Sequence, residues 1–309
     1  MSEEALPARR RWPPWWRLAG PLLLGVMLWR VGPANIWSEL RDADPLWFAS
    51  ACALSVPALA VKAYRWQTIL RAAGHEVSLA DCAGVYAAGS LAGAVTPGKV
   101  GDFAKAPLLA SRGVPWKTGV AASLLDRALD ATLLFVAGLG SLLMLPALPG
   151  LPGQTILGAS LAAGITLSVG VAVAIQRLFP RVFRLSGFGW WLVAGATTLG
   201  GLAPYFGSVY CCARALRLPL SLLDSTAGSA VAAVLSLLPV TVGGIGTRDA
   251  AFVTIFARRG VDAEHAIALS GLVLAWMAVN CVLFYAVARL CGHRQNSCVP
   301  STPLGSDSR

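Results

Sequence analysis

Two short polar breaks interrupt a chain that is otherwise strongly apolar. The first runs from Thr96 to Asp102 with the sequence TPGKVGD, and the second runs from Pro239 to Asp249 with the sequence PVTVGGIGTRD. Each break follows an apolar run and precedes a short apolar segment. Helix-breaking residues and charges at membrane depth are tolerated only where they line a protected cavity. Two such breaks in corresponding places therefore predict a polar site at the interface between two repeats.

The composition indicates a polytopic membrane protein. Hydrophobic residues make up 56% of the 309 residues and charged residues only 13%, against about 25% charge in a soluble domain. The formal net charge of +10 lies mostly in short loops and tails, which is typical of cytoplasmic loops and argues against a nucleic acid partner. The seven Cys show no CxxC or Cys/His spacing, so we expect no metal and no cofactor.

The order of segments repeats along the chain. An apolar run at 79–95, a short segment at 102–111 and a long helix at 116–145 correspond to segments at 220–238, 247–257 and 266–290. Gly113-Val114 precedes an Ala-x-Ser triplet at the same spacing as Gly260-Val261 does. We interpret this as an internal duplication with pseudo-repeat halves at about 18–146 and 155–291. Residues 1–293 would form a single integral membrane domain, and residues 294–309 a disordered polar tail.

The charge pattern sets the expected orientation. Basic residues at 9–17, 62–71 and 177–184 are placed inside and the acidic loop at 39–44 outside, which predicts a multi-pass protein of a bacterial plasma (inner) membrane with a cytoplasmic N-terminus. A segment as short as 102–111 spans ~15 Å as a helix and cannot cross a ~30 Å hydrocarbon core. The predicted fold is therefore all-α, with six full spans and two re-entrant helical hairpins in inverted halves. Eight full spans stay open as an alternative, because the first arrangement places four basic residues outside: Arg214, Arg217, Arg258 and Arg259.

The breaks offer the chemistry of an anion site. The short helix after each break presents unpaired N–H groups and the positive end of its dipole. Lys99 and Arg248 add full positive charge, which suits a phosphate. Alternatively, Asp102 and Asp249 only cap these helices and pair with Lys99, Lys105 or Arg248. Glycines would let the backbone approach a ligand closely, namely Gly98, Gly101, Gly243, Gly244 and Gly246.

A second charged group lies within the long helix predicted at 116–145. Asp126 and Asp130 share a helix face at i, i+4, and Arg127 reaches Asp130 at i, i+3. Charges this deep should face the protein interior or a wet cavity. One interpretation is a self-contained structural pair. The other is that Arg127 binds an anionic headgroup and Asp130 holds Arg127 in place.

Arg65 lies between Tyr64 and Trp66 at the end of the span that begins near Pro45. It is either an interface anchor or a contact for a lipid headgroup. Trp residues near the predicted span ends are expected to form an aromatic belt, namely Trp12, Trp15, Trp16, Trp47, Trp66, Trp116, Trp190 and Trp191.

The paired motifs resemble those of the lysylphosphatidylglycerol synthetase transmembrane-region family, also called flippase-like domain proteins. The first motif comprises Thr96 to Asp102, Arg112-Gly-Val114 and the LLDRALD stretch from Leu124 to Asp130. The second comprises Leu238 to Asp249 and Gly260-Val261, and Arg65-Trp66 also fits. The family commonly has Glu where this chain has Asp249. The resemblance implies lipid handling by a stand-alone member without the soluble synthetase domain, and it implies translocation of an anionic or modified phospholipid.

Together these observations predict a transporter-like translocase for an anionic or phosphate-bearing lipid headgroup, with no catalytic residues. The proposed contacts are Lys99, Arg127 and Arg248. Asp102, Asp130 and Asp249 would either position these cations or take part in proton coupling, and no His or Glu falls within the apolar spans. Two alternatives stay open. One is an intramembrane enzyme acting on a phospholipid or a polyprenyl phosphate. The other is a non-catalytic partner of a membrane-bound lipid or glycan synthase.

Overall fold

The computed structural model describes residues 41–141, 188–236 and 247–296, together with isolated helical positions between 162 and 177. Every regular element in these ranges is helical, as the sequence predicts. The first predicted span, the loop after the first half and the glycines of the second break lie outside the described residues. The last helix continues to Asn296, so it includes the start of the segment expected to be a tail.

The described helices follow the predicted order in both halves. Two of them, Pro45–Ala72 (which comprises α3 and α4) and Ala263–Cys291, are long and apolar enough to cross a membrane by length and composition. The number of full crossings stays a prediction. The first half contains α3 (Pro45–Ala53), α4 (Ser55–Ala72), α5 (Leu79–Val95), η2 (Pro97–Ala104), α6 (Lys105–Ala110) and α7 (Trp116–Ser141). The second half contains α9 (Phe188–Ala215), α10 (Leu222–Leu235), α11 (Thr247–Phe256), η4 (Ala257–Arg259) and α12 (Ala263–Asn296).

The helices α5 and α10 begin with the same cap. The hydroxyl of Ser78 accepts a hydrogen bond from the backbone N–H of Asp81, and Ser221 accepts one from Asp224, both at 3.1 Å. Such a cap satisfies an N–H group that has no partner within the helix. The Ser-x-x-Asp pattern therefore starts the helical hairpin of each half.

A salt bridge closes the base of each hairpin. Arg112, after α6, places its Nε 3.1 Å from Asp81 Oδ1, and Arg259, in η4, places its Nε 2.7 Å from Asp224 Oδ1. The glycine after each arginine, Gly113 or Gly260, has a φ near +75° to +79°, which ends the short helix in the left-handed conformation that glycine adopts readily. The bases of the two hairpins therefore share the same cap, salt bridge and glycine.

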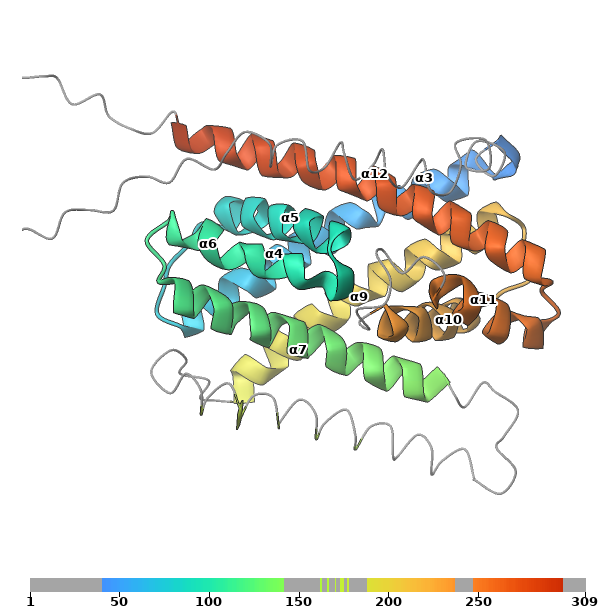
Figure 1. Ribbon diagram of the computed structural model, residues 1–309, viewed down its shortest axis with the longest axis horizontal. Helices are drawn as coiled ribbons and strands as arrows, with labels where there is room; N and C mark the ends of the chain where they lie inside the picture. Colours follow the sequence, from blue (N-terminus) through green and yellow to red (C-terminus); the bar gives the residue numbers. More distant parts are fainter. Residues whose placement is uncertain are drawn as a thin grey trace, which may run out of the picture.

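Long helices of each half pack against helices of the other half. The helix α7 packs on α10 of the other half, α12 packs on α5, and α4 packs on α9. Figure 1 shows the α5–α6 hairpin and the α10–α11 hairpin towards opposite ends of the long axis, with α7 and α12 running along opposite sides of the molecule. This reciprocal packing creates the interface between the halves.

The first hairpin is held closed by a backbone contact at Gly101. A Cβ added there would lie 2.1 Å from the carbonyl oxygen of Ala92 in α5, so only glycine fits without moving the chain. The N–H of Gly101 donates to Thr96 Oγ1 at 2.6 Å. The break thus folds η2 tightly against α5.

We expect Gly101→Ala to destabilise the protein by about 1–3 kcal/mol, because the added methyl overpacks a backbone contact. Thermal unfolding followed by Trp fluorescence in detergent measures the change. Gly195→Ala in α9 is the matched control, because an added Cβ there meets nothing within 4 Å and alanine favours the helix by up to ~1 kcal/mol. Equal unfolding temperatures for the two variants would contradict the close contact.

Candidate functional site

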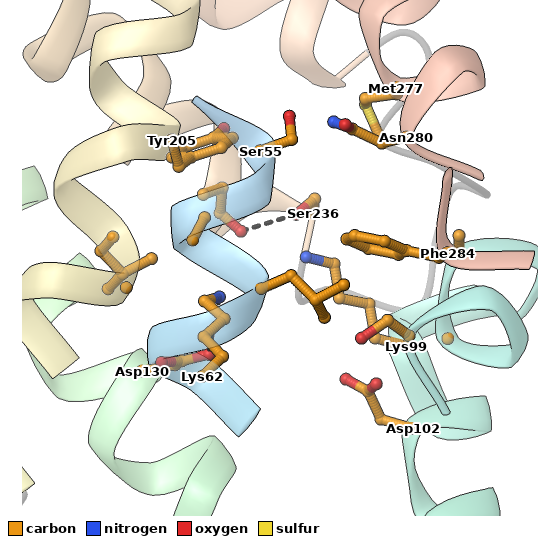
Figure 2. A pocket seen from close by; sticks show the side chains of 18 of the residues that line it. Ser55, Lys62, Lys99, Asp102, Asp130, Tyr205, Ser236, Met277, Asn280 and Phe284 are labelled. Atoms are coloured by element: carbon orange, nitrogen blue, oxygen red, sulfur yellow. Dashed lines mark hydrogen bonds and ion pairs between the residues drawn. The ribbon is translucent and has the colours of Figure 1, made fainter. Parts of the chain in front are cut away.

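A cavity of about 450 Å³ lies between the two halves. Helices of both halves contribute to its wall, including α4, α5, η2 and α7 from the first half and α9 to α12 from the second. Figure 2 shows side chains from several of these helices converging on it. Its charged lining residues in the described part of the chain are Lys62, Lys99, Asp102, Arg127, Asp130 and Arg248.

A buried ion cluster lies beside the cavity, centred on Asp126. Its carboxylate is 2.6 Å from Arg65 Nη2, 3.0 Å from Lys105 Nζ and 3.2 Å from Arg127 Nη2. The side chains of Asp126 and Lys105 are fully buried, and that of Arg65 is 1% exposed. Since an unpaired buried charge is costly, each of these groups depends on the others.

The two carboxylates in the cavity wall are also paired with cations. Asp102 lies 2.9 Å from Arg127 Nη1. Asp130 lies 2.7 Å from Arg65 Nη1, 3.1 Å from Arg127 Nη2 and 3.5 Å from Lys62 Nζ. The predicted contact between Arg127 and Asp130 is therefore present. The group is not a self-contained pair, however, because α4 and η2 supply further charges.

Arg127 is held in a fixed position at the cavity wall. In addition to its three carboxylate contacts, its Nη2 donates to the hydroxyl of Tyr86 at 3.1 Å. Its side chain is still 24% exposed, and its Nε has no hydrogen-bond partner among the described residues. Arg127 can therefore offer positive charge to a ligand without having to be reoriented.

Lys99 is the most available cation of the cavity. It is exposed, and no ion pair joins its ammonium group to another described residue. In Figure 2 its side chain reaches from η2 into the middle of the pocket. Its backbone φ is +58°, a conformation that costs a non-glycine residue roughly 1–2 kcal/mol. Strain of this kind is found most often at functional sites.

Arg248 brings positive charge from the second half. It lies in the first turn of α11 and is buried, with Nε 2.8 Å from Ser270 Oγ and Nη1 3.2 Å from Met277 Sδ. Both hydrogen-bond partners are neutral. Asp249, next to it, is partly buried and does not line the cavity.

The structure changes the expected roles of several residues in the first break. Asp102 pairs with Arg127, not with Lys99, Lys105 or Arg248. The N–H of Gly101 is occupied by Thr96 and cannot serve as a bare amide for a ligand. Gly98 lies beside Lys99 in η2, whereas Gly243, Gly244 and Gly246 lie outside the described residues.

Arg65 and Trp66 lie in the core, so their expected positions were wrong. Arg65 is neither an interface anchor nor part of the cavity wall, because its guanidinium is used by Asp126 and Asp130. Trp66 is fully buried and meets Tyr86 edge to face, so it does not join an aromatic belt. Both residues instead support the charged cluster.

Sequence reasoning missed Lys62 as a member of the site and named Lys105 only as a possible partner of Asp102 or Asp249. Lys62 precedes Arg65 by three positions on one helix face, and this spacing could have linked them. Lys105 is a charge within the otherwise apolar segment KAPLLA, which is itself a signal. Its ammonium also lies 4.1 Å from the ring centre of Tyr86 and 4.8 Å from that of Trp66, so the aromatic faces stabilise it further.

We expect Asp126→Asn to destabilise the protein by about 3–5 kcal/mol, because Arg65 and Lys105 would be left as buried cations without their shared anion. The same change at Asp262, which is 85% exposed, should cost less than about 1 kcal/mol. Denaturation in detergent compares the two variants. A small loss of stability for Asp126→Asn would mean that water reaches the ion cluster and that it is not buried.

One similar protein is named as a glycosyltransferase. The chain is 29% identical over 124 residues to a protein of Haloferax volcanii named Glycosyltransferase AglD. The match covers 40% of this chain but only 20% of that protein, so the chain spans a small part of its relative.

The family comparison covers nearly the whole membrane region. The family described as the Lysylphosphatidylglycerol synthase TM region matches residues 17–288. This range includes both polar breaks, both hairpins and every charged residue that lines the cavity. It also agrees with a membrane location. The chain therefore belongs to the lysylphosphatidylglycerol synthase transmembrane-region family.

Proposed function

We propose that this protein moves a phosphate-bearing lipid headgroup between the leaflets of a membrane. The observation that carries the proposal is the cavity between the halves, where Lys99 has no ion pair among the described residues and the carboxylates are already engaged. Positive charge left without a partner at membrane depth is costly. An anionic headgroup would supply the missing charge.

The arrangement of the halves suits transport across a membrane. We infer two inverted halves, with the hairpins α5–α6 and α10–α11 re-entering from opposite sides and the N-terminus in the cytoplasm of a plasma (inner) membrane. Their positions towards opposite ends of the molecule support this arrangement (Figure 1). In transporters with such repeats, one half rocks against the other around a central site. Because α7 packs on α10 and α12 packs on α5, these two helices would couple the movements of the two hairpins.

An intramembrane enzyme is less well supported by the geometry. The candidate bases or nucleophiles are Asp102, Asp126, Asp130 and Asp249. Asp249 does not line the cavity, and each of the other three carboxylates lies within 3.2 Å of at least one cation. A carboxylate held in this way is poorly placed to take a proton from a substrate.

A partnership with a lipid or glycan synthase is the second candidate. The similarity to a protein named as a glycosyltransferase favours it. Purification from native membranes tests this candidate directly. A synthase that co-purifies in a fixed ratio, with no lipid movement by the isolated chain, would replace the translocase proposal.

Transport should depend on Lys99 separately from stability. We expect Lys99→Gly to slow the movement of a fluorescent phosphatidylglycerol at least tenfold in a dithionite-quenching vesicle assay. Thermal stability should hold or rise, because glycine relieves the strain of a positive φ by about 1 kcal/mol.

Arg217→Gly is the matched control for this experiment. Arg217 is also a cation with positive φ, at +57°, but it lies in the loop after α9 and not in the cavity. This variant should keep full transport. If Lys99→Gly transports lipid as fast as Arg217→Gly, the cavity is not the transport site.

Arg248 provides a test from the second half. We expect Arg248→Ala to reduce transport in the same vesicles, because the cavity loses one of the four cations that line it in the described part of the chain. Arg258→Ala, at an exposed position in η4, should leave the rate unchanged. An unaltered rate for Arg248→Ala would exclude the second half from the site.

A further inference from the structure

The cavity wall sets two chemical requirements, which together limit the class of lipid headgroup that can bind. We propose that the headgroup is a phosphodiester carrying an uncharged, hydroxyl-bearing substituent, such as a sugar or a polyol, and not an amine. This inference rests on the proposed lipid-handling function. It deepens that function by naming the class of lipid.

The first requirement is that the headgroup carries negative charge and has no ammonium group. Four cationic side chains and two carboxylates line the cavity in the described part of the chain. Asp102 and Asp130 are both engaged by Arg127, and Asp130 also by Arg65 and Lys62. No described carboxylate in the wall is left to pair with an amine, so an amine would add like charge to a cationic cavity.

The second requirement is that the headgroup carries hydrogen-bond donors. Asn280 of α12 lines the cavity, and its buried Oδ1 has no hydrogen-bond partner among the described residues. A buried acceptor without a donor costs free energy. In Figure 2, Asn280 lies at the same end of the pocket as Tyr205 and Ser55, away from Asp102 and Asp130. This end of the pocket therefore combines neutral polar groups with the unpaired carbonyl oxygen of Asn280.

Among phosphate-bearing headgroups, one class meets both requirements. A doubly ionised phosphate monoester carries negative charge but no donor. An amine-bearing headgroup carries donors but adds positive charge. A phosphodiester with a hydroxylated substituent brings one negative charge near Lys99 and neutral donors for Asn280. The volume of about 450 Å³ lies within the ~300–1,000 Å³ range of small-molecule sites.

Competition among lipids with matched acyl chains tests the inference in the full-length protein. The detergent-purified chain is mixed with equal amounts of phosphatidylglycerol, phosphatidylinositol, phosphatidic acid, phosphatidylethanolamine and lysyl-phosphatidylglycerol, and native mass spectrometry counts the bound lipid. A separate arm offers a polyprenyl-phosphate hexose, which distinguishes a glycan carrier from a phospholipid. We expect at least tenfold more binding of a hydroxylated, amine-free lipid than of either amine-bearing lipid. Equal or stronger binding of the amine-bearing lipids would overturn the inference.

The role of Asn280 is tested by a ratio within one sample. We expect Asn280→Ala to reduce the preference for the hydroxylated lipid over phosphatidic acid at least fivefold, while binding of phosphatidic acid persists and shows that the variant is folded. Val279→Ala is the matched control, because Val279 is 42% exposed and does not line the cavity. An unchanged ratio for Asn280→Ala would contradict the assigned donor contact. Should that variant fail to fold, the wild-type lipid preference decides the inference.

The two proposals fail in different ways. Selective binding without lipid movement in vesicles would refute the translocase and support the headgroup class. Equal movement of amine-bearing and hydroxylated lipids would refute the headgroup class and support the translocase.

Discussion

The carboxylate of Asp126 accepts contacts from cations on three different helices. Arg65 comes from α4, Lys105 from α6 and Arg127 from α7. Because all these groups are wholly or largely buried, none can be moved without leaving charge uncompensated. This single anion therefore ties the short helix α6 to α7, on which it packs, and to Arg65 of α4. The same hairpin carries Lys99 in η2, directly before α6. The position of the hairpin therefore places Lys99 in the cavity.

The two halves are alike at the hairpin bases and differ at the centre. Counted from Gly113 and Gly260, Lys105 corresponds to Phe252 and Asp126 corresponds to Val273. Phe252 and Val273 are buried in one apolar cluster, so the second half packs the equivalent junction without charge. Apolar side chains can replace a buried ion pair at little or no cost in stability. We infer that the first half keeps its charges to position Arg127 for a ligand, since the fold can be built without them.

The sequence predicted what depends on local spacing. The first break, the short helices after both breaks and the face shared by Arg127 and Asp130 follow from residue order and helical periodicity. The contact of Arg65 with Asp126 joins positions far apart in the chain, and no periodicity says which helices will face each other. Likewise, Gly101 was expected to free its amide for a ligand, but its N–H is used to close the hairpin. Glycine in a break can serve close packing as readily as ligand approach, and only the fold distinguishes the two.

The central claim is that an anion occupies the cavity between the halves. The most direct measurement is a cryo-EM map of the protein in nanodiscs made from a hydroxylated anionic phospholipid. The account predicts density for a lipid phosphate within hydrogen-bond distance of Lys99 Nζ and close to Arg127. Lipid density confined to the outer surface, with no headgroup between the halves, would contradict it.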